Sequence, residues 1–485
     1  MIILLASAEL DHFANVGGLA DISAALPRGW ADLSHEPIVI IPKYQCITDF
    51  TEIHSTNIEF TICNLSVRVF KSHLPESTIS VYLLECDELY DRPGIYGNPD
   101  GYEDNDLRFY VLCKAAFELM IELNISPDVI SAHDYHTALL MPLLKIDYAR
   151  HPQFLNTKGV LTIHNAQYQG WYDNERIREF SHWEFIEKDS HSPFLFHDHF
   201  NALYSGINFS DAIIAVSPGY ANEILTEEYG AGLHEVFNNN RHKLSGILNG
   251  VNYGLWNPSD DCHINQHFTI LDKSGKVQGR KFLLQSLFDD EKDLLPDSLP
   301  VFGIESRFTE QKGFELLEDC IENCLKDKKI RLIVLGSGDA RYEDYFSRIQ
   351  NSFPGYCSYT RGYDEELAHR ILAYADFFLM PSLFEPCGLT QLYAMKYGTI
   401  PIVRHVGGLK DTIEDFNQIQ LIGNGITFSE FTSSALLRAI DMAIDIYGNK
   451  SLMNPLIDNA MHCDYSIHKT AIQYIESFET LKERH

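Results

Sequence analysis

The sequence predicts an α/β protein made of two doubly wound domains, each built on a mostly parallel sheet. Short apolar runs rich in β-branched residues alternate with longer stretches of helical periodicity, which is the pattern of parallel strands joined by crossover helices. The chain has 485 residues, more than one hydrophobic core usually supports. Turn-forming residues gather between 248 and 261, so we expect the domain boundary there.

Six strands are predicted in the first half, at 2–6, 37–41, 81–84, 129–132, 160–163 and 212–216. The first residues could be taken for the apolar part of a signal peptide. No basic residue precedes Arg28, however, and Glu9 and Asp11 follow at once, so we expect a buried first strand. Four strands are predicted in the second half, at 301–304, 331–335, 377–380 and 400–403.

The expected domains follow from these elements. An N-terminal Rossmann-like domain would cover 1–250, a linker 251–260, and a C-terminal Rossmann-like domain 261–463. Within the last segment, 464–485, the residues at 466–484 carry an apolar stripe along one helical face, and such a stripe needs a partner surface. We expect this helix to pack back on the N-terminal domain. Ligands are expected at the carboxyl ends of strands, in a deep cleft that the two domains face.

The composition limits the partners of the protein. An apolar share of 45% with 22% charged residues is ordinary for a globular protein, but a formal net charge of -30 is not. Such a surface would repel nucleic acid and anionic lipid, so we expect neither nucleic acid nor a membrane as a partner, whereas a neutral glucan meets no such penalty. The ten cysteines contain no C-x-x-C pair, and reduced thiols in the cytoplasm are expected.

The segment 384–412 is the most informative part of the chain. Glu385 directly precedes a turn and a predicted helix N-terminus, and helix N-termini attract anions because their first N–H groups are unpaired. This arrangement suits a ligand that carries both hydroxyls and phosphates. The Val-Gly-Gly-Leu-x-Asp sequence at 406–411 also occurs at 16–21, so we expect two distant strand-to-helix turns to be built alike.

Polar residues follow several predicted strands. His164 follows the strand at 160–163, the segment 133–136 follows the strand at 129–132, and the segment 305–307 follows the strand at 301–304. Arg307 and Lys312 lie five apart across a turn and could together clamp a diphosphate, because guanidinium grips phosphate oxygens in a fork and ammonium adds a point charge. A surface salt bridge or a helix cap is the alternative for this pair.

Three other patterns have structural alternatives. His133 and His136 could be metal ligands, but no third ligand is spaced for them. Asp104 and Asp106 have the D-x-D form of metal-dependent sugar transferases, yet they precede a predicted helix, where an N-cap is the commoner use of Asp. The G-x-G turn at 336–339 is similar to a phosphate loop, or it allows only a tight bend.

Taken together, the chain resembles the bacterial glycogen synthases and plant starch synthases, which are retaining glycosyltransferases of the two-Rossmann GT-B architecture. The similar segments are 16–21, 91–97, 133–137, 162–165, 243–251, 306–313, 362–365 and nearly all of 378–412. The Glu-Pro-Cys-Gly-Leu-Thr-Gln block at 385–391 is highly specific. The resemblance implies transfer of glucose from ADP-glucose to the non-reducing end of an α-1,4-glucan, without a cofactor or a metal.

The resemblance also implies roles for residues of the C-terminal half. Glu385 would contact the donor glucose hydroxyls, while Arg307 and Lys312 would hold the diphosphate. Tyr363 matches the position that flanks the adenine. The distal phosphate would meet backbone N–H groups in the segment formed by Cys387, Gly388, Leu389 and Thr390.

In the N-terminal half, the resemblance places His164 beside the reacting sugar, with Asp134 and Asn165 near it. The favoured mechanism of this family is front-face attack, in which the departing phosphate takes the acceptor proton and the backbone carbonyl of His164 shields the sugar cation. Further substrate contacts implied by the resemblance are Gly18, Asp21, Tyr96 and Asn249.

Two positions depart from the family pattern. Asn15 stands where the family usually has a lysine that reaches the donor phosphate, and Leu383 stands where an arginine is common. These departures keep a second hypothesis open, namely a weakly active or inactive synthase-like protein that binds glucan or nucleotide. Phosphorylase, another α-glucan enzyme of this architecture, needs a pyridoxal-binding lysine segment that the sequence does not show.

Overall fold

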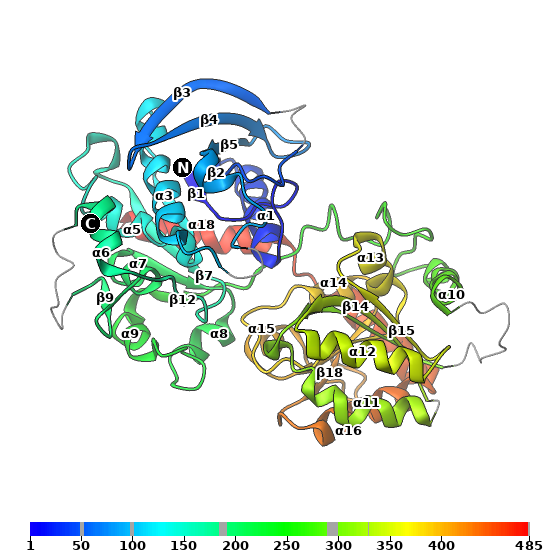
Figure 1. Cartoon of the computed structure of the whole chain (residues 1–485). Helices are drawn as coiled ribbons and strands as arrows, with labels where there is room; N and C mark the ends of the chain where they lie inside the picture. Colours follow the sequence, from blue (N-terminus) through cyan, green and yellow to red (C-terminus); the bar gives the residue numbers. More distant parts are fainter. Residues whose placement is uncertain (49–52, 98–100, 184–191, 289–298, 328, 484–485) are drawn as a thin grey trace. The chain divides into compact units, whose positions relative to one another are not determined.

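The structure is a computed structural model that describes residues 1–48, 53–97, 101–183, 192–288, 299–327 and 329–483. Its contacts divide the chain into two compact units (Figure 1). The first unit consists of Met1–Gly250 together with Ile467–His485, and the second consists of Val251–Ser466. The division falls inside the turn-forming cluster, and residues 251–260 belong to the second unit.

The first unit is built on a sheet of nine strands within the described residues. Neighbours from β12 to β5 run parallel, whereas β4 and β3 add an antiparallel hairpin at one edge. The strand order reverses at β1, with later strands β6, β7 and β11 on one side and β2 and β5 on the other. In spatial order the strands are β12 (Leu244–Gly246), β11 (Ala212–Ala215), β7 (Lys158–Ile163), β6 (Val129–His133), β1 (Ile2–Ala6), β2 (Glu36–Pro42), β5 (Ser80–Glu85), β4 (Leu65–His73) and β3 (His54–Ile62).

Every strand predicted for the first half is present, with ends within two residues of the prediction. The β3–β4 hairpin was not predicted, because its strands alternate exposed polar and half-buried side chains and lack a continuous apolar run. Its turn residues Cys63 and Asn64 both have positive φ values, 52° and 63°, as a two-residue hairpin loop requires.

Helices and a small antiparallel sheet complete the first unit. The sheet has the order β8 (Trp171–Tyr172), β10 (His199–Asn201) and β9 (Leu195–Phe196). The helices are α1 (Gly18–Asp32), α2 (Asp87–Tyr90), α3 (Asn105–Glu122), α4 (Asp134–Thr137), α5 (Leu140–Lys145), η1 (Pro152–Phe154), α6 (Asn174–Ser181), α7 (Ala202–Phe209), α8 (Pro218–Glu223), α9 (His234–Asn239), η2 (Arg241–Lys243) and α18 (Ile467–Glu483).

The last helix, α18, packs against α1 in this unit (Figure 1). The Trp30 ring lies 6.0 Å from that of Tyr474 and 5.7 Å from that of Phe478, measured between centroids. A Cβ atom on Gly29 would lie 2.6 Å from the Cβ of Ala471, so the glycine allows the two helices to approach closely. The apolar stripe therefore has a partner surface; Arg484, part of the expected segment, lies outside the described residues.

The second unit is built on a parallel sheet of six strands within the described residues. The strand order reverses between β13 and β16, which makes this unit doubly wound as well, and the predicted fold class is confirmed. In spatial order the strands are β15 (Cys357–Arg361), β14 (Arg331–Gly338), β13 (Val301–Phe308), β16 (Phe377–Met380), β17 (Ile400–Arg404) and β18 (Ile426–Phe428). The helices are α10 (Ser274–Phe288), η3 (Glu310–Lys312), α11 (Glu315–Lys326), α12 (Ala340–Ser352), α13 (Glu365–Tyr374), α14 (Thr390–Lys396), α15 (Gly407–Thr412), α16 (Ser433–Tyr447) and α17 (Lys450–His462).

Two strands of this sheet extend at least three residues beyond their predicted ends. Residues 305–307 were expected after the strand, but they lie within β13, which stays paired with β14 as far as Phe308 opposite Gly338. Gly336, Ser337 and Gly338 are the last residues of β14 and Asp339 caps α12, so the G-x-G forms neither of the two turns considered from the sequence. Its glycines serve close packing, because a Cβ atom would lie 2.1 Å from the Ser306 carbonyl oxygen at Gly336 and 2.4 Å from that of Phe308 at Gly338.

The two similar Val-Gly-Gly-Leu segments begin helices in different ways. In the second unit α15 starts at Gly407, directly after β17, whereas in the first unit the loop 7–17 separates β1 from α1. The N–H groups of Val16 and Gly17 donate to the Glu9 carboxylate, but the N–H of Gly408 donates to the backbone carbonyl of Glu385. The expectation that the two strand-to-helix turns are built alike is therefore wrong, because the loop 7–17 precedes α1 whereas only residues 405–406 lie between β17 and α15.

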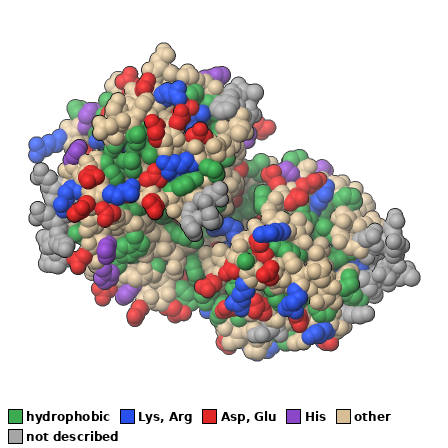
Figure 2. Space-filling view, in the orientation of Figure 1, with side chains coloured by type: hydrophobic (Ala, Val, Ile, Leu, Met, Phe, Trp, Pro, Cys, Tyr) green, Lys and Arg blue, Asp and Glu red, His purple; other side chains and the backbone are tan. Residues whose placement is uncertain are grey.

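The surface carries charges of both signs. Figure 2 shows acidic and basic side chains interspersed on the face that it presents. No helix in the described part of the chain combines the length and the apolar character that crossing a membrane requires.

Candidate active site

Three polar side chains form a hydrogen-bonded chain at the carboxyl ends of β6 and β7. The Ser131 Oγ lies 3.2 Å from Nε2 of His133, and Nδ1 of His133 lies 2.9 Å from Nε2 of His164. His133 is fully buried, while His164 is partly exposed. Because both ring nitrogens of His133 have partners, the metal alternative for His133 and His136 has no support here.

Asp134 fixes the backbone of the segment that carries His164. Its Oδ1 accepts the N–H of His164 at 2.7 Å and the N–H of Asn165 at 3.3 Å. Asp134 has a φ of 58°, a left-handed conformation that Asp tolerates better than most residues. The structure thus brings together the three predicted residues His164, Asp134 and Asn165.

Burial is the main cause of the pKa shifts of His133, Asp134 and His164. It lowers the pKa of His164 to about 3, and burial followed by the repulsion of His164 lowers the pKa of His133. Burial raises the pKa of Asp134 to about 7, against the N–H groups of His164 and Asn165, which lower it. At neutral pH His164 is therefore a neutral imidazole, which can donate or accept a hydrogen bond but adds no positive charge.

Glu9 is a buried carboxylate that the sequence analysis did not assign to the site. Its Oε2 accepts the N–H groups of Val16 at 2.9 Å and Gly17 at 3.0 Å, and its Oε1 accepts the hydroxyl of Tyr96. The Tyr96 ring stacks on His136, with centroids 4.8 Å apart. The signal that could have found Glu9 is an acidic residue that closely follows a buried strand, at the edge where ligands bind.

The other predicted residues of this unit lie in different surroundings. Asn15 is exposed, and its Nδ2 donates to Oδ1 of Asp11 at 3.0 Å. Gly18 is the exposed first residue of α1, and Asp21 lies in the first turn of that helix. Asn249 is buried, with an exposed fraction of 4%, and its Oδ1 has no hydrogen-bond partner.

In the second unit, Lys312 and Glu385 form an ion pair. The Nζ of Lys312 lies 2.7 Å from Oε2 of Glu385, and the Ser382 hydroxyl donates to the same oxygen at 3.1 Å. Glu385 is buried, with an exposed fraction of 6%. Lys312 does form a salt bridge, but not the surface one considered as an alternative. Its partner is Glu385, a buried carboxylate of the predicted site.

Glu305 places a second carboxyl group near Lys312. Burial raises the pKa of Glu305 to about 7, and the positive charge of Lys312 acts in the opposite direction. The exposed side chain of Arg307 belongs to the same strand, β13, and Lys312 ends the short η3 turn that follows. From the sequence we expected Lys312 and Gly313 to open the next helix; in the structure Lys312 ends η3, and α11 begins at Glu315.

The turn after Glu385 packs against α15, because a Cβ atom on Gly408 would lie 2.3 Å from the Cys387 carbonyl oxygen. Gly388 has a φ of 72°, and a Cβ atom there would lie 2.4 Å from Oε1 of Gln391. The Gln391 Nε2 donates to the carbonyls of Cys387 at 3.2 Å and Gly388 at 3.0 Å. Leu389 is the N-cap residue of α14 and Thr390 its first residue, so the four predicted backbone contacts lie in one compact turn.

Two further predicted positions are exposed. Tyr363 has an exposed fraction of 71% and lies between β15 and α13. Leu383, where the family commonly has arginine, is 38% exposed. The guanidinium of Arg404 donates to the backbone carbonyl of Leu383.

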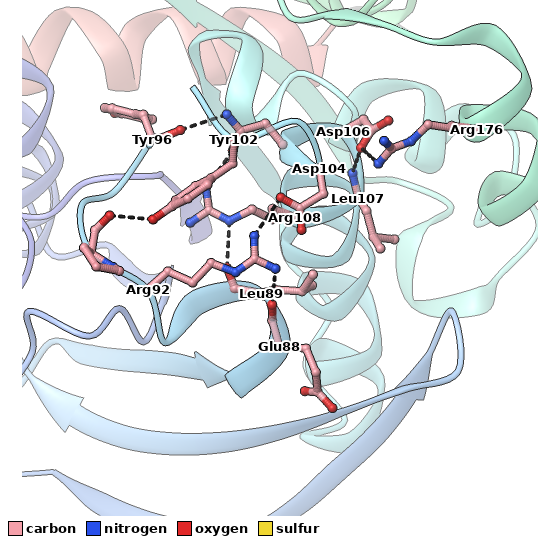
Figure 3. Close-up of polar contacts among 12 residues, drawn as sticks. Glu88, Leu89, Arg92, Tyr96, Tyr102, Asp104, Asp106, Leu107, Arg108 and Arg176 are labelled. Carbon is pink, nitrogen blue, oxygen red and sulfur yellow. Dashed lines mark hydrogen bonds and ion pairs between the residues drawn. The ribbon is translucent and has the colours of Figure 1, made fainter. Parts of the chain in front are cut away.

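Both carboxylates of the D-x-D motif form ion pairs with arginines (Figure 3). Asp104 pairs with Arg92 at 2.8 Å, and the buried Asp106 pairs with Arg176 at 2.7 Å. Asp104 does occupy the N-cap position of α3, but its side chain makes no capping hydrogen bond, so the N-cap prediction is right about the place and wrong about the bond. Asp106 also accepts the backbone N–H of Leu107 at 2.7 Å, so this carboxylate serves both a guanidinium and the helix backbone.

Two family models match the chain, one in each half. The model of the starch synthase catalytic domain matches residues 2–239, and the model of glycosyl transferases group 1 matches residues 286–461.

Curated relatives and solved structures are similar over nearly the whole chain. A glycogen synthase from Bacillus licheniformis is 35% identical, over 98% of this chain and 97% of that protein. Glycogen synthase 1 from Geobacter metallireducens is 37% identical, over 97% of this chain and 94% of that protein. The catalytic domain of starch synthase IV from Arabidopsis thaliana, solved bound to ADP and acarbose, has a TM-score of 0.91 and 29% sequence identity, covering 100% of this chain and 99% of that one.

Proposed function

Because the chain belongs to the starch and glycogen synthase family, whose members are glycosyltransferases, we propose that it transfers glucose from ADP-glucose to the non-reducing end of an α-1,4-glucan. The family resemblance predicted from the sequence is confirmed, and the protein is a hexosyltransferase of the starch and glycogen synthase type. The observation that carries the proposal is the buried Glu385–Lys312 pair beside the Gly388 turn. It combines a hydroxyl-binding carboxylate with a phosphate-binding cation.

On the donor side, Glu385 accepts hydrogen bonds from glucose hydroxyls, and Lys312 and Arg307 hold the diphosphate. Departure of a nucleoside diphosphate builds negative charge on the phosphates, so fixed cations and backbone N–H groups there lower the barrier. The N–H groups of Gly388, Leu389 and Thr390 serve the distal phosphate. Tyr363, whose ring is exposed, covers the adenine. The starch synthase structure that contains ADP supports this choice of nucleotide.

On the sugar side, His164 contacts the reacting glucose, with Asp134 and Asn165 beside it. The attack takes place at the front face, so the departing phosphate takes the acceptor proton and the backbone carbonyl of His164 shields the oxocarbenium ion. A neutral imidazole suits this place, because a positive charge beside the sugar cation would raise the barrier. Asp134 supports the shielding role of the His164 carbonyl, because its Oδ1 accepts the His164 N–H at 2.7 Å and so orients that peptide segment.

The remaining contacts of the first unit are proposed for the glucan and the donor. Gly18 and Asp21 lie at the start of α1, and Tyr96 is fixed by Glu9. Asn249 offers a buried amide oxygen without a partner, which a ligand hydroxyl could satisfy.

A cytoplasmic location is proposed as well, on the grounds that all ten cysteines are free thiols.

A second candidate function has one observation in its favour. The Asn15 amide is bonded to Asp11, so neither of these positions supplies the cation that the family usually has there. A protein that binds glucan or nucleotide but transfers glucose slowly would fit this loss.

One assay tests both candidates. The protein is incubated with glycogen and either ADP-glucose or UDP-glucose labelled in the glucose, and label in the polymer is followed, with Glu385→Gln as the control protein. We expect label to enter faster from ADP-glucose, and an exo-acting enzyme that cleaves α-1,4 bonds from non-reducing ends should release it. Binding of glycogen without transfer from either donor would favour the second candidate.

A further inference from the structure

A group of metal-binding side chains lies in the second unit, apart from the residues proposed for glucosyl transfer. His263, Glu365 and His369 each offer one ligand atom, and these atoms all lie within 4.8 Å of one another. Nε2 of His263 lies 3.8 Å from Oε1 of Glu365, and the two histidine rings are 4.5 Å apart between centroids. Two nitrogens and one carboxylate oxygen form the ligand set of many zinc sites.

The fold places these side chains together for a local reason. Glu365 and His369 are four residues apart on α13, so they project from the same face of the helix. His263 comes from the segment before α10, about a hundred residues earlier in the chain. No metal site is predicted from the sequence, since nothing in the spacing of these three residues joins the segment to the helix.

Asp261 holds the ring of His369 and the backbone of His263. Its Oδ2 lies 2.7 Å from Nδ1 of His369, and its Oδ1 accepts the backbone N–H of His263 at 2.8 Å. The Asp261 side chain is fully buried, and the hydroxyl of Tyr397 also donates to it. A histidine that binds a metal almost always has its other ring nitrogen bonded to a carboxylate or carbonyl, and Asp261 supplies that partner. Nε2 of His369 is therefore the nitrogen left for a ligand.

The ring of His369 is also fixed by packing. Trp256 stacks on it with centroids 3.8 Å apart and an angle of 9° between the planes. The His369 side chain is 5% exposed, whereas His263 is 31% and Glu365 61% exposed. The His369 side chain is thus held rigidly, whereas the side chains of His263 and Glu365 are exposed to solvent and can move. An ion can reach the site from the solvent side.

We propose that His263, Glu365 and His369 bind a zinc ion, with water in the fourth position. Bonds of about 2.0–2.1 Å in a tetrahedron put the ligand atoms about 3.3 Å apart, so the two exposed side chains would move in around His369. The ion would join the segment that contains His263 to the first turn of α13. That turn begins two residues after Tyr363, so the ion would stabilise the chain next to the proposed adenine contact.

The experiment measures metal binding to the full-length protein without any substrate, so its result does not depend on the proposed activity. The chelator-treated protein is titrated with Zn²⁺ by calorimetry and with Co²⁺ by visible absorption. We expect one ion per chain, with the d–d absorption of a tetrahedral nitrogen and oxygen site. His263→Gln and Glu365→Gln should each weaken binding at least about tenfold. Both positions are on the surface, so these variants should fold.

Glu366→Gln is the matched control, because Glu366 is the neighbouring carboxylate and pairs with Arg370. This variant should bind Zn²⁺ as the wild type does. Equal binding by the wild type and both ligand variants would overturn the proposal, as would the absence of stoichiometric binding to the wild type. A thiolate-to-cobalt charge-transfer band would place the ion on a cysteine such as the exposed Cys262, and would overturn this ligand set.

Discussion

Single residues set the charge of both groups of site residues. In the second unit the buried Glu385 is neutralised by Lys312 at 2.7 Å, and in the first unit burial keeps the imidazole of His164 neutral. A buried charge that loses its partner is costly, so a substitution of Glu385 or Lys312 should act partly through the charge that is left unpaired. Three predictions follow at this scale.

Glu385→Gln should lower kcat by about 10²–10³-fold, because Glu385 acts on the sugar, where the transition state differs most from the ground state. The affinity for ADP should stay the same or increase, since Lys312 then has no carboxylate competing for it. Steady-state kinetics and calorimetry with ADP measure the two effects. Glu310→Gln, at an exposed position near Lys312, is the control and should change neither. A loss of ADP affinity as large as the loss of kcat would contradict the assignment of Glu385 to the sugar.

Asn15→Lys should raise the rate of glucosyl transfer. A cation near the departing phosphate is worth about 1–3 kcal/mol, or about ten- to a hundredfold in rate. In the structure Asn15 is bonded to Asp11, and a new lysine could pair with that carboxylate instead. The double variant Asn15→Lys with Asp11→Asn should therefore be faster than the single one. If neither variant is faster than the wild type in a folded state, another cation already serves this phosphate.

The buried histidines should make the protein less stable in acid. The pKa of His136 is lowered to about 3 by burial, so the folded state cannot take the proton that the unfolded state binds near pH 6.5. The stability from this group is present above about pH 6.5 and is lost as the pH falls towards about 3. Asp134, with a pKa raised to about 7, acts in the opposite direction, because its contribution is lost as the pH rises through that value.

His136→Phe tests this effect, since phenylalanine keeps the ring stacked on Tyr96. The midpoint of thermal unfolding should fall less for the variant than for the wild type between about pH 7.5 and about pH 5.5, on either side of the usual imidazole pKa of about 6.5. His468→Gln, at an exposed position of α18, should behave as the wild type. An equal fall in the wild type and in His136→Phe would mean that other groups cause the acid sensitivity.

At the scale of elements, the contact between α18 and α1 is the clearest case of one element needing another. The helix has the apolar face that its sequence predicts, and Tyr474 and Phe478 are fully buried, with Trp30 of α1 against both rings and Thr162 of β7 3.4 Å from the Tyr474 hydroxyl. Isolated helices of this length are marginal in water, so most of the stability of α18 comes from this packing.

Phe478→Ala should therefore lower the free energy of unfolding by about 3–5 kcal/mol, the usual cost of removing a fully buried phenylalanine. Thermal or denaturant unfolding of the whole chain measures the change. Glu479→Ala, on the exposed side of the same helix, is the control and should change stability little. A cost at Phe478 no larger than at Glu479 would mean that α18 detaches readily from α1.

Elements also show where sequence reasoning failed. Residues 305–307 were expected to follow the strand at 301–304, although β13 continues through them to Phe308. Glu305, Ser306 and Arg307 have no strand-like hydrophobic pattern, so local sequence could not reveal that β14 offers them a complete hydrogen-bonded partner. The hairpin of β3 and β4 was missed for the related reason that its strands are only half buried.

At the scale of the whole molecule, the balance of charge bears on the mechanism. The net charge is -30, yet the proposed donor site carries the cations Lys312 and Arg307. Side chains thus supply the positive charge that a departing diphosphate needs, so the proposed transfer chemistry requires no metal. The D-x-D carboxylates, which are the alternative metal ligands, are paired with Arg92 and Arg176.

Turnover should accordingly survive treatment with EDTA. Initial rates with ADP-glucose and glycogen are compared before and after chelation, and again after adding Mg²⁺ or Mn²⁺. Removal of zinc from His263, Glu365 and His369 should lower the thermal midpoint but leave the rate at 25 °C within about twofold, because that site lies outside the proposed chemistry. Strict dependence on Mg²⁺ or Mn²⁺ would reject the metal-free mechanism and would favour metal binding by Asp104 and Asp106.

The sequence by itself determined the fold class, the family and the place of most strands. Alternation of apolar strands and helical periods is a local property, and so is a specific block such as that at 385–391, so both can be seen without a structure. Only the tertiary structure decided which side chains meet. Glu385 and Lys312 are 73 residues apart, His133 and His164 are 31 apart, and Asp261 and His369 are 108 apart. The physical reason is that a hydrogen bond or an ion pair acts over a few ångströms in space, and the fold brings distant parts of the chain within that range.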